Sequence, residues 1–352
     1  MQEHPRRFQP CPSLAELPPP PTGKVGWPWT EESDGCPIPA APHGPAQRSL
    51  VEVLSVTPAG SWEGAAEAAE QYWPSISIVT PSYNQAAYIE ETIRSVLLQG
   101  YPRLEYIIID GGSTDGSAEI IRRYERWLTY WVSEADNGQS DAINRGWRLA
   151  SGKWTTWINS DDWLAQNALV SVGRAARNSQ PASVIAGTVV NVDSITGVNK
   201  AIRPHHINIE NVIAFWRPTC VWHQPGLFFP KSVLDEVGYL DTTLHYAMDF
   251  DLLCRVLPVS KVVYVNEPVA FFRLHFESKG VSQPAQTGRE KMAIVRRYCN
   301  LSGLSPWRRE LELRLWLVRA IGSAIKRRNW RGLPILLYGG RRRTSDGMTF
   351  DG

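Results

Sequence analysis

From Ser75 onward the sequence alternates between short apolar segments and amphipathic segments, and this alternation strongly constrains the fold. Strands are expected near 76–80, 104–110, 129–133, 154–158 and 183–191, and helices near 86–99, 116–127, 139–150 and 167–178. A buried strand followed by an amphipathic helix is the repeating unit of a parallel sheet with helices on its faces. The sequence therefore predicts an α/β fold with a Rossmann-like, mostly parallel sheet.

The segments that flank this region differ from it in composition. Residues 1–74 are rich in proline and are expected to form an arm that is disordered or loosely laid on the domain, with one short strand at 51–56. Residues 75–285 would form the main domain, in which the alternation weakens after about 192 and a short helix is expected at 207–216. Residues 286–352 are basic and helical in pattern, and would form a C-terminal extension.

Two interpretations of this extension are open. Its segment 311–328 mixes leucine, tryptophan, valine and isoleucine with arginine and lysine, as in amphipathic helices that lie on anionic membrane surfaces. The same pattern is typical of a helix that docks on the main domain and keeps its arginines in water. No segment has the roughly 18–20 consecutive apolar residues of a spanning helix, and the N-terminus lacks a signal-peptide core. A cytoplasmic protein is expected, either free or peripheral on the inner face of the cell membrane.

Composition excludes several classes of function. The net charge of +2 over 352 residues gives no general argument for nucleic-acid binding, and no nucleic-acid-binding motif is recognisable. The cysteines are scattered without a Cys-x-x-Cys pair, so neither a zinc cluster nor a disulfide framework is indicated. We expect free thiols at Cys11, Cys36, Cys220, Cys254 and Cys299.

Polar side chains follow three of the expected strands. Trp-Ile-Asn-Ser-Asp-Asp ends in Asp161 and Asp162, Tyr-Ile-Ile-Ile ends in Asp110 before two glycines, and Val-Thr-Pro-Ser-Tyr carries Pro81 and Tyr83. The carboxyl ends of parallel strands meet at one edge of a sheet, so these residues would crowd around one ligand. Adjacent carboxylates at a strand end suit Mg²⁺ or Mn²⁺ carrying a diphosphate.

These three strand ends, taken in order, resemble the nucleotide-sugar-binding half of a family 2 glycosyltransferase with the GT-A fold. The resemblance covers about 75–280. It implies that Pro81, Tyr83 and Asp110 hold the nucleoside, and that Asp161 and Asp162 hold the ribose edge and the metal-bound diphosphate. Relatives more often have an acid where this chain has Asn159, so the first position of their Asp-x-Asp signature is altered.

The resemblance also assigns residues around the sugar. In Gly-Gln-Ser-Asp-Ala-Ile-Asn, Asp141 would approach the ribose or the sugar, although a helix-capping role is the competing interpretation. Gln224, directly before the apolar Leu-Phe-Phe strand, would touch the donor sugar or the acceptor. His275 occupies the place where several relatives have a metal-binding histidine, and an imidazole ligand would suit Mn²⁺ somewhat better than Mg²⁺.

The pair Met248–Asp249 lies where similar enzymes carry the aspartate that deprotonates the acceptor hydroxyl. Asp249 would then be the catalytic base, with helix capping as the alternative, whereas Asp251 fits a structural role better. The resemblance implies a metal-dependent, inverting transfer of a sugar from a nucleoside-diphosphate donor to a hydroxyl on a saccharide or lipid-linked acceptor, in polysaccharide or glycolipid synthesis. Two alternatives stay open: transfer to a polyprenyl phosphate, and a non-catalytic protein that binds nucleotide sugars or glycans.

Overall fold

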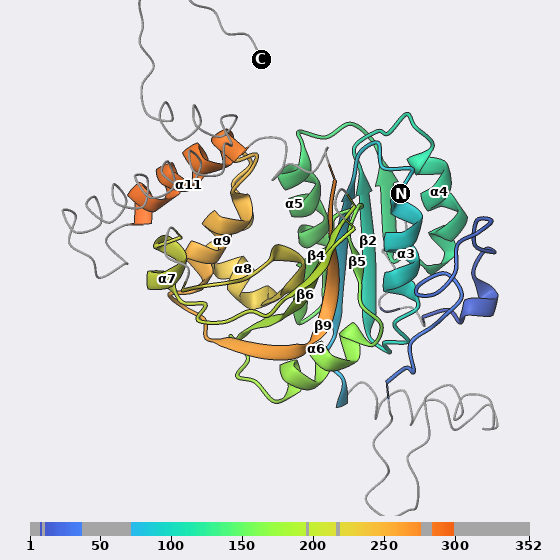
Figure 1. Ribbon diagram of the computed structural model, residues 1–352, viewed down its shortest axis with the longest axis horizontal. Helices are drawn as coiled ribbons and strands as arrows, with labels where there is room; N and C mark the ends of the chain where they lie inside the picture. Colours follow the sequence, from blue (N-terminus) through green and yellow to red (C-terminus); the bar gives the residue numbers. More distant parts are fainter. Residues whose placement is uncertain are drawn as a thin grey trace, which may run out of the picture.

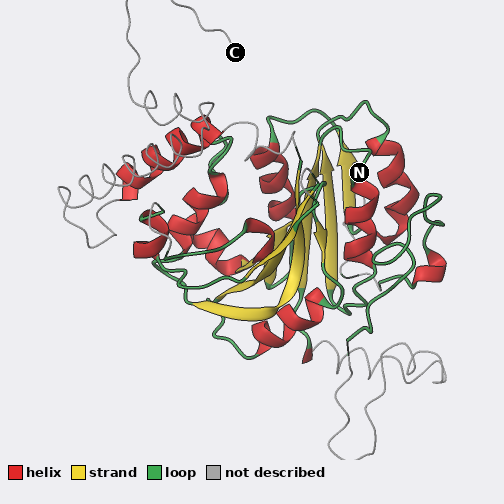
Figure 2. Ribbon diagram, viewed as in Figure 1, coloured by secondary structure: helices red, strands yellow, loops and turns green. Residues whose placement is uncertain are grey.

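The protein is an α/β domain in which helices cover both faces of one sheet (Figures 1 and 2). The computed structural model describes residue 8 and residues 11–36, 72–194, 197–215, 219–275 and 284–298. The expected strand at 51–56, most of the C-terminal extension and Cys299 lie outside these residues. Cys11, Cys36, Cys220 and Cys254 are free thiols, as expected.

The first half of the sheet is parallel, as the sequence predicts. Its strands run in the order β3-β2-β1-β4, with neighbours paired in parallel. The strands are β1 (Ile76–Ser82), β2 (Leu104–Asp110), β3 (Tyr130–Ser133) and β4 (Trp154–Trp157). The helices that connect them are α3 (Ile89–Leu97), α4 (Ser117–Tyr124) and α5 (Gln139–Leu149). These elements confirm the predicted alternation, with ends that differ by a few residues.

The second half of the sheet continues in the order β8-β6-β9-β5, and β7 pairs with β6. β8 runs antiparallel to both β4 and β6, whereas β9 runs parallel to β6. The strands are β5 (Trp163–Leu164), β6 (Val184–Asp193), β7 (Asn199–Ile202), β8 (Leu227–Pro230) and β9 (Val262–Leu274). β6 and β8 confirm strands expected from the sequence, whereas β5, β7 and β9 were not expected.

Two apolar cores hold the layers together. On one face of the sheet, α3, α4 and α6 (Ala168–Arg177) pack over Ile76, Ile78 and their neighbours. On the other face, α5 packs over Val79, Ile107 and Ile109, and the same core continues into the later helices. These are α7 (Ile209–Ile213), α8 (Lys231–Val237), α9 (Met248–Val256) and α11 (Pro284–Tyr298). The boundary expected at 285 therefore falls inside α11.

Residues 11–36 pack against α3, beside α4 (Figure 1). Leu17, Trp29 and Cys36 are buried, and the Nε1–H of Trp27 donates a 2.8 Å hydrogen bond to the Leu164 carbonyl. The buried guanidinium of Arg94 donates hydrogen bonds to the carbonyls of Pro18 (2.8 Å), Pro28 (3.1 Å) and Trp29 (3.0 Å). From the sequence, the whole proline-rich arm is expected to be disordered or loosely attached, whereas residues 11–36 pack against the domain.

A glycine allows α5 to lie close to β1. A Cβ atom on Gly146 would collide with the branched side chain of Val79, which has no flexible end that could move away. We expect Gly146→Ala to lower the free energy of unfolding by about 1–3 kcal/mol, as overpacking of a core does. Urea unfolding would measure it. The matched control is Gly288→Ala in α11, where nothing lies within 4 Å, and it should be neutral or slightly stabilising. Equal stability of the two variants would contradict this account.

Candidate active site

A cavity of about 700 Å³ lies at the carboxyl ends of β1, β2 and β4. Its walls come from the turns after these strands, from the first turn of α5, from the loop before α9 and from the end of β9. Of the residues singled out from the sequence, the cavity is lined by Pro81, Tyr83, Asp161, Gln224, Asp249 and His275. The structure therefore brings residues from widely separated parts of the chain to one ligand-sized space at the edge where open α/β sheets bind ligands.

The turn after β4 directs its two aspartates differently. The Asp161 carboxylate lines the cavity, and its Oδ2 lies 3.0 Å from Nε2 of His275. Asp162 is 1% exposed and accepts hydrogen bonds from the backbone N–H of Arg273 (2.9 Å) and from Nδ2 of Asn159 (3.1 Å). Burial, and then the neighbouring Asp161 carboxylate, raise the pKa of Asp162 well above its usual value.

These contacts determine which side chains could hold a divalent cation. Asp161 and His275 present a carboxylate oxygen and an imidazole nitrogen side by side, a donor set that suits Mn²⁺. Asp162, expected to be a ligand, does not line the cavity because both of its oxygens accept hydrogen bonds inside the protein. Within the described ranges, no group of three or more acidic, histidine or cysteine side chains could hold a metal. The residues present thus fit a cation whose remaining ligands come from a diphosphate and water.

Asp110 and Asp141 also differ in position from what the resemblance implied. Asp110 is fully buried, and its carboxylate accepts hydrogen bonds from Ser133 Oγ (2.6 Å) and from the N–H and Oγ of Ser113 (2.9 and 2.6 Å). Asp141 accepts from the backbone N–H of Asn137 (3.2 Å), so it closes the turn into α5. Neither residue lines the cavity, although their neighbours Gly111, Gly138 and Gln139 do.

Asp249 lies in the first turn of α9 and faces the cavity. The N-cap of α9 is Ala247, so Asp249 is not the capping residue, and its Oδ1 accepts a 2.7 Å hydrogen bond from the N–H of Phe250. Burial raises the pKa of Asp249, and the Lys291 ammonium opposes this shift. Asp251 is buried instead and accepts from Nε of Arg255 (2.9 Å), which gives it a structural role.

Three buried polar atoms in the cavity wall have no hydrogen-bond partner among the described residues: Ser82 Oγ, Gln85 Oε1 and Gln224 Oε1. Gln224 is 9% exposed, and its Nε2–H donates to the Trp157 carbonyl at 2.7 Å, which fixes the amide. Buried polar atoms normally have partners, so a group of unpaired ones in one cavity indicates a polar ligand. Neither Ser82 nor Gln85 was singled out from the sequence, although Ser82 ends β1 and Gln85 follows it by three residues.

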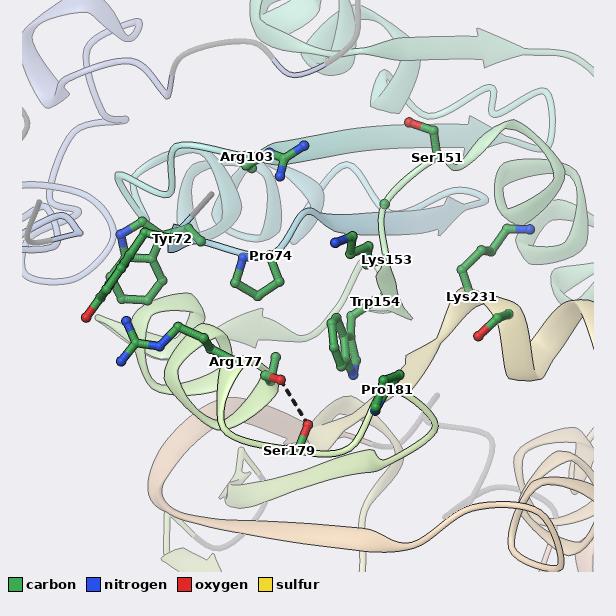
Figure 3. A pocket seen from close by; sticks show the side chains of 14 residues that line it. Tyr72, Pro74, Arg103, Ser151, Lys153, Trp154, Arg177, Ser179, Pro181 and Lys231 are labelled. Carbon is green, nitrogen blue, oxygen red and sulfur yellow. Dashed lines mark hydrogen bonds between the residues drawn. The ribbon is translucent and has the colours of Figure 1, made fainter. Parts of the chain in front are cut away.

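Figure 3 shows a second cavity, of about 560 Å³, with the side chains that line it. It lies around the amino ends of β1, β2 and β4 and contains none of the residues expected at the site. Its lining includes four basic residues and no carboxylate. Arg177 stacks on the Tyr72 ring at 3.8 Å, and Lys231 pairs with Asp235. This cavity lacks the groups for metal binding or general base chemistry.

The model of Glycosyl transferase family 2 matches residues 77–238. Residues 77–238 belong to this family. The glycosyltransferase domain thus contains the turns after β1, β2 and β4 and Gln224, whereas Asp249, His275 and α11 follow the matched segment. The recognition made from the strand-end motifs is confirmed.

Two curated relatives carry the same activity in their names. An uncharacterized glycosyltransferase of Mycobacterium tuberculosis, MT1564, is 29% identical over 195 residues, which cover 55% of this chain and 72% of that protein. The putative teichuronic acid biosynthesis glycosyltransferase TuaG of Bacillus subtilis is 39% identical over 92 residues, which cover 25% of this chain and 36% of TuaG. Together with the family match, these relatives show that the chain is an enzyme of the glycosyltransferase class.

Solved structures show the same fold. S. aureus TarS 1–349 in complex with UDP-GlcNAc superposes with a TM-score of 0.54 at 17% identity, covering 75% of this chain and 79% of TarS 1–349. The mannosyltransferase PcManGT from Pyrobaculum calidifontis, in complex with GDP-Man and Mn²⁺, gives a TM-score of 0.50 at 18% identity, covering 80% and 93%. The fold is GT-A-like, as the sequence predicts. Among the described residues, no helix has the length and hydropathy needed to cross a bilayer.

Proposed function

We propose that this glycosyltransferase moves a sugar from a nucleoside-diphosphate donor to a hydroxyl group of a saccharide or lipid-linked acceptor, with inversion at the anomeric carbon. The observation that carries the proposal is one cavity in which Asp161, after β4, lies beside His275, after β9, Asp249 faces the same space, and unpaired polar atoms line the wall. The exposed Tyr83 ring at the rim could stack on the base.

In the proposed reaction, Asp249 accepts the proton of the acceptor hydroxyl. The hydroxyl oxygen forms a bond to the anomeric carbon while the bond from that carbon to the diphosphate oxygen breaks, and the nucleoside diphosphate leaves. One displacement inverts the anomeric centre, so no nucleophilic carboxylate is required. Gln224, whose amide is fixed by Trp157, orients a sugar hydroxyl through its unpaired Oε1.

We propose Asp161 and His275 as the residues that hold the metal ion. A bound Mg²⁺ or Mn²⁺ supplies positive charge that stabilises the diphosphate as a leaving group. PcManGT, which shares the fold, is in complex with GDP-Man and Mn²⁺, and this supports the use of a metal ion with the donor. Asp162 would act indirectly in this scheme, because its hydrogen bond to the Arg273 N–H fixes the end of β9 beside Asp161.

The substrates are inferred at the level of class. TarS and PcManGT are complexed with UDP-GlcNAc and GDP-Man, and TuaG is named for teichuronic acid biosynthesis. These names support a nucleotide-sugar donor and a role in building a cell-envelope polysaccharide or glycolipid. We propose that the enzyme works in the cytoplasm, where its basic C-terminal extension contacts the inner face of the membrane.

The first test is the thermal stability of the full chain with UDP, GDP or dTDP, each with and without Mn²⁺. One nucleotide should raise the melting temperature, and more so with Mn²⁺, because a ligand that binds only the folded state stabilises it. Hydrolysis of UDP-GlcNAc and GDP-mannose then identifies the donor. No shift with any nucleotide, together with no hydrolysis of either sugar nucleotide, would contradict the proposed function.

A further inference from the structure

Glu290 in α11 binds the loop that leads into α9. Its Oε1 accepts a hydrogen bond from the backbone N–H of His245 (3.0 Å), and its Oε2 accepts from the N–H groups of Tyr246 and Ala247 (2.8 Å each). Three consecutive backbone donors before a helix are thus satisfied by one carboxylate from another helix. These donors would otherwise lack a partner within the helix, and a negative charge at this end is favoured by the helix dipole.

This loop belongs to the active-site wall. His245, Tyr246, Met248 and Asp249 all line the cavity described above. Ala247, the N-cap of α9, has no side chain that could cap the helix itself. The direction of the first turn of α9, and with it the position of the Asp249 carboxylate, therefore depends on the Glu290 contacts.

The rest of α11 is anchored on α9, as their neighbouring positions in Figure 1 illustrate. Ile294 and Val295 are each 1% exposed and join the core that contains α9. Arg297 Nη1 and the Tyr298 hydroxyl both lie 3.3 Å from Oδ1 of the buried Asp251. α11 is therefore held from Glu290, near its middle, to its C-terminal end, and Glu290 cannot shift without displacing a packed helix.

Lys291 follows Glu290 and carries a positive charge close to Asp249. Its Nζ lies 5.6 Å from the centre of the Phe250 ring and 5.9 Å from that of Phe215. Its charge lowers the pKa of Asp249 against the raising effect of burial, and Glu290 raises that pKa by a smaller amount. His223 has a pKa lowered to about 4 by burial and by Lys291, so it is neutral near pH 7.

We propose that α11 is a positioning element of the active site: Glu290 holds the loop that starts α9, and Lys291 places a positive charge beside the catalytic carboxylate. This rests on the proposed function, since it takes Asp249 as the base. Both residues lie in a segment beyond the matched family region. In this view the start of the C-terminal extension is part of the catalytic machinery.

The positioning role of Glu290 is tested with Glu290→Gln in the full chain. A glutamine presents an N–H where one oxygen stood, so at least one backbone donor loses its acceptor. We expect faster hydrogen–deuterium exchange at the amides of 245–247 and a fall in kcat of about 10- to 100-fold, as small misplacements of a catalytic group produce. Affinity for UDP and GDP with Mn²⁺ should not change. Glu236→Gln, an exposed acid in α8, is the matched control and should alter neither quantity.

The charge role of Lys291 is tested with Lys291→Gln, and Arg296→Gln on the exposed side of α11 is the control with equal charge change. Removing the ammonium should raise the pKa of Asp249 further, because the anion loses its favourable partner. The acid limb of the kcat–pH profile should therefore move to higher pH in Lys291→Gln and stay in place in Arg296→Gln. A carboxyl ¹³C titration of Asp249 by NMR reports the same shift without requiring turnover.

The outcomes separate this inference from the proposed function. If the wild type binds no nucleotide, the proposed function fails, whereas the exchange and NMR measurements still test the positioning by α11. Unchanged exchange at 245–247 in Glu290→Gln, or faster exchange with unchanged kcat, would overturn the role of Glu290. Equal Asp249 titration in the two charge variants would overturn the role of Lys291.

Discussion

Asp249→Asn is expected to reduce sugar transfer by about 10²–10⁴-fold, the usual contribution of a positioned general base. Asparagine keeps the shape of the side chain but cannot accept the proton of the acceptor hydroxyl at neutral pH. Binding of the nucleoside diphosphate with Mn²⁺ should be nearly unchanged, because Asp249 approaches the cavity from α9 and not from the β4 turn. Transfer rates and calorimetric affinities of the purified variant would measure both effects.

Asp251→Asn provides the contrast for this prediction. Asp251 is buried and accepts hydrogen bonds from Arg255, Arg297 and Tyr298, so its substitution should lower the free energy of unfolding and affect kcat only indirectly. A loss of nucleotide affinity in Asp249→Asn would reassign that residue to the donor site. Unchanged transfer would remove it from the mechanism.

Asp161→Asn is expected to abolish most of the metal dependence of donor binding. Loss of a direct ligand should exceed the effect of about 10–100-fold on metal affinity that is typical of a residue supporting a ligand. In Asp162→Asn, by contrast, Asp161 and His275 remain at the cavity, so most of the Mn²⁺ dependence should be retained. Titration of UDP or GDP at several Mn²⁺ concentrations distinguishes the variants. If Asp162→Asn loses more of the Mn²⁺ effect than Asp161→Asn, the assignment based on orientation is wrong.

The parallel half of the fold could be predicted from the sequence because three of its strands, β1, β2 and β4, are buried on both faces. Ile76–Ser82 and Leu104–Asp110 are buried at every position, and their apolar residues (Ile76, Ile78 and Val79 in the first, Tyr106–Ile109 in the second) mark them in the sequence. β9 was missed because Val262–Leu274 is only partly buried and includes a register shift opposite Gly187–Val189 of β6, so no regular period marks it. β5 has two residues and pairs only through a partner far along the chain.

The sequence identified which turns form the site but not how each side chain is oriented in it. Two adjacent aspartates after a strand look equivalent in sequence, yet the Arg273 backbone draws Asp162 inward and leaves Asp161 at the cavity. Asp110 was expected at the ligand, but serines on two neighbouring segments satisfy it. No motif in the sequence marks Glu290 as part of the site, since it binds backbone N–H groups 43 to 45 residues away.

The packing of 11–36 bears on how the enzyme can be shortened for laboratory work. A fragment that starts at Tyr72, chosen to fit the family match, would remove the three carbonyls that accept from Arg94. A guanidinium that keeps its contact with the Tyr124 hydroxyl (3.3 Å) but has lost these three acceptors would remain in α3, beside apolar side chains that are no longer covered. Such a truncated protein should be prone to aggregate, so expression vectors need to encode the proline-rich arm together with the domain.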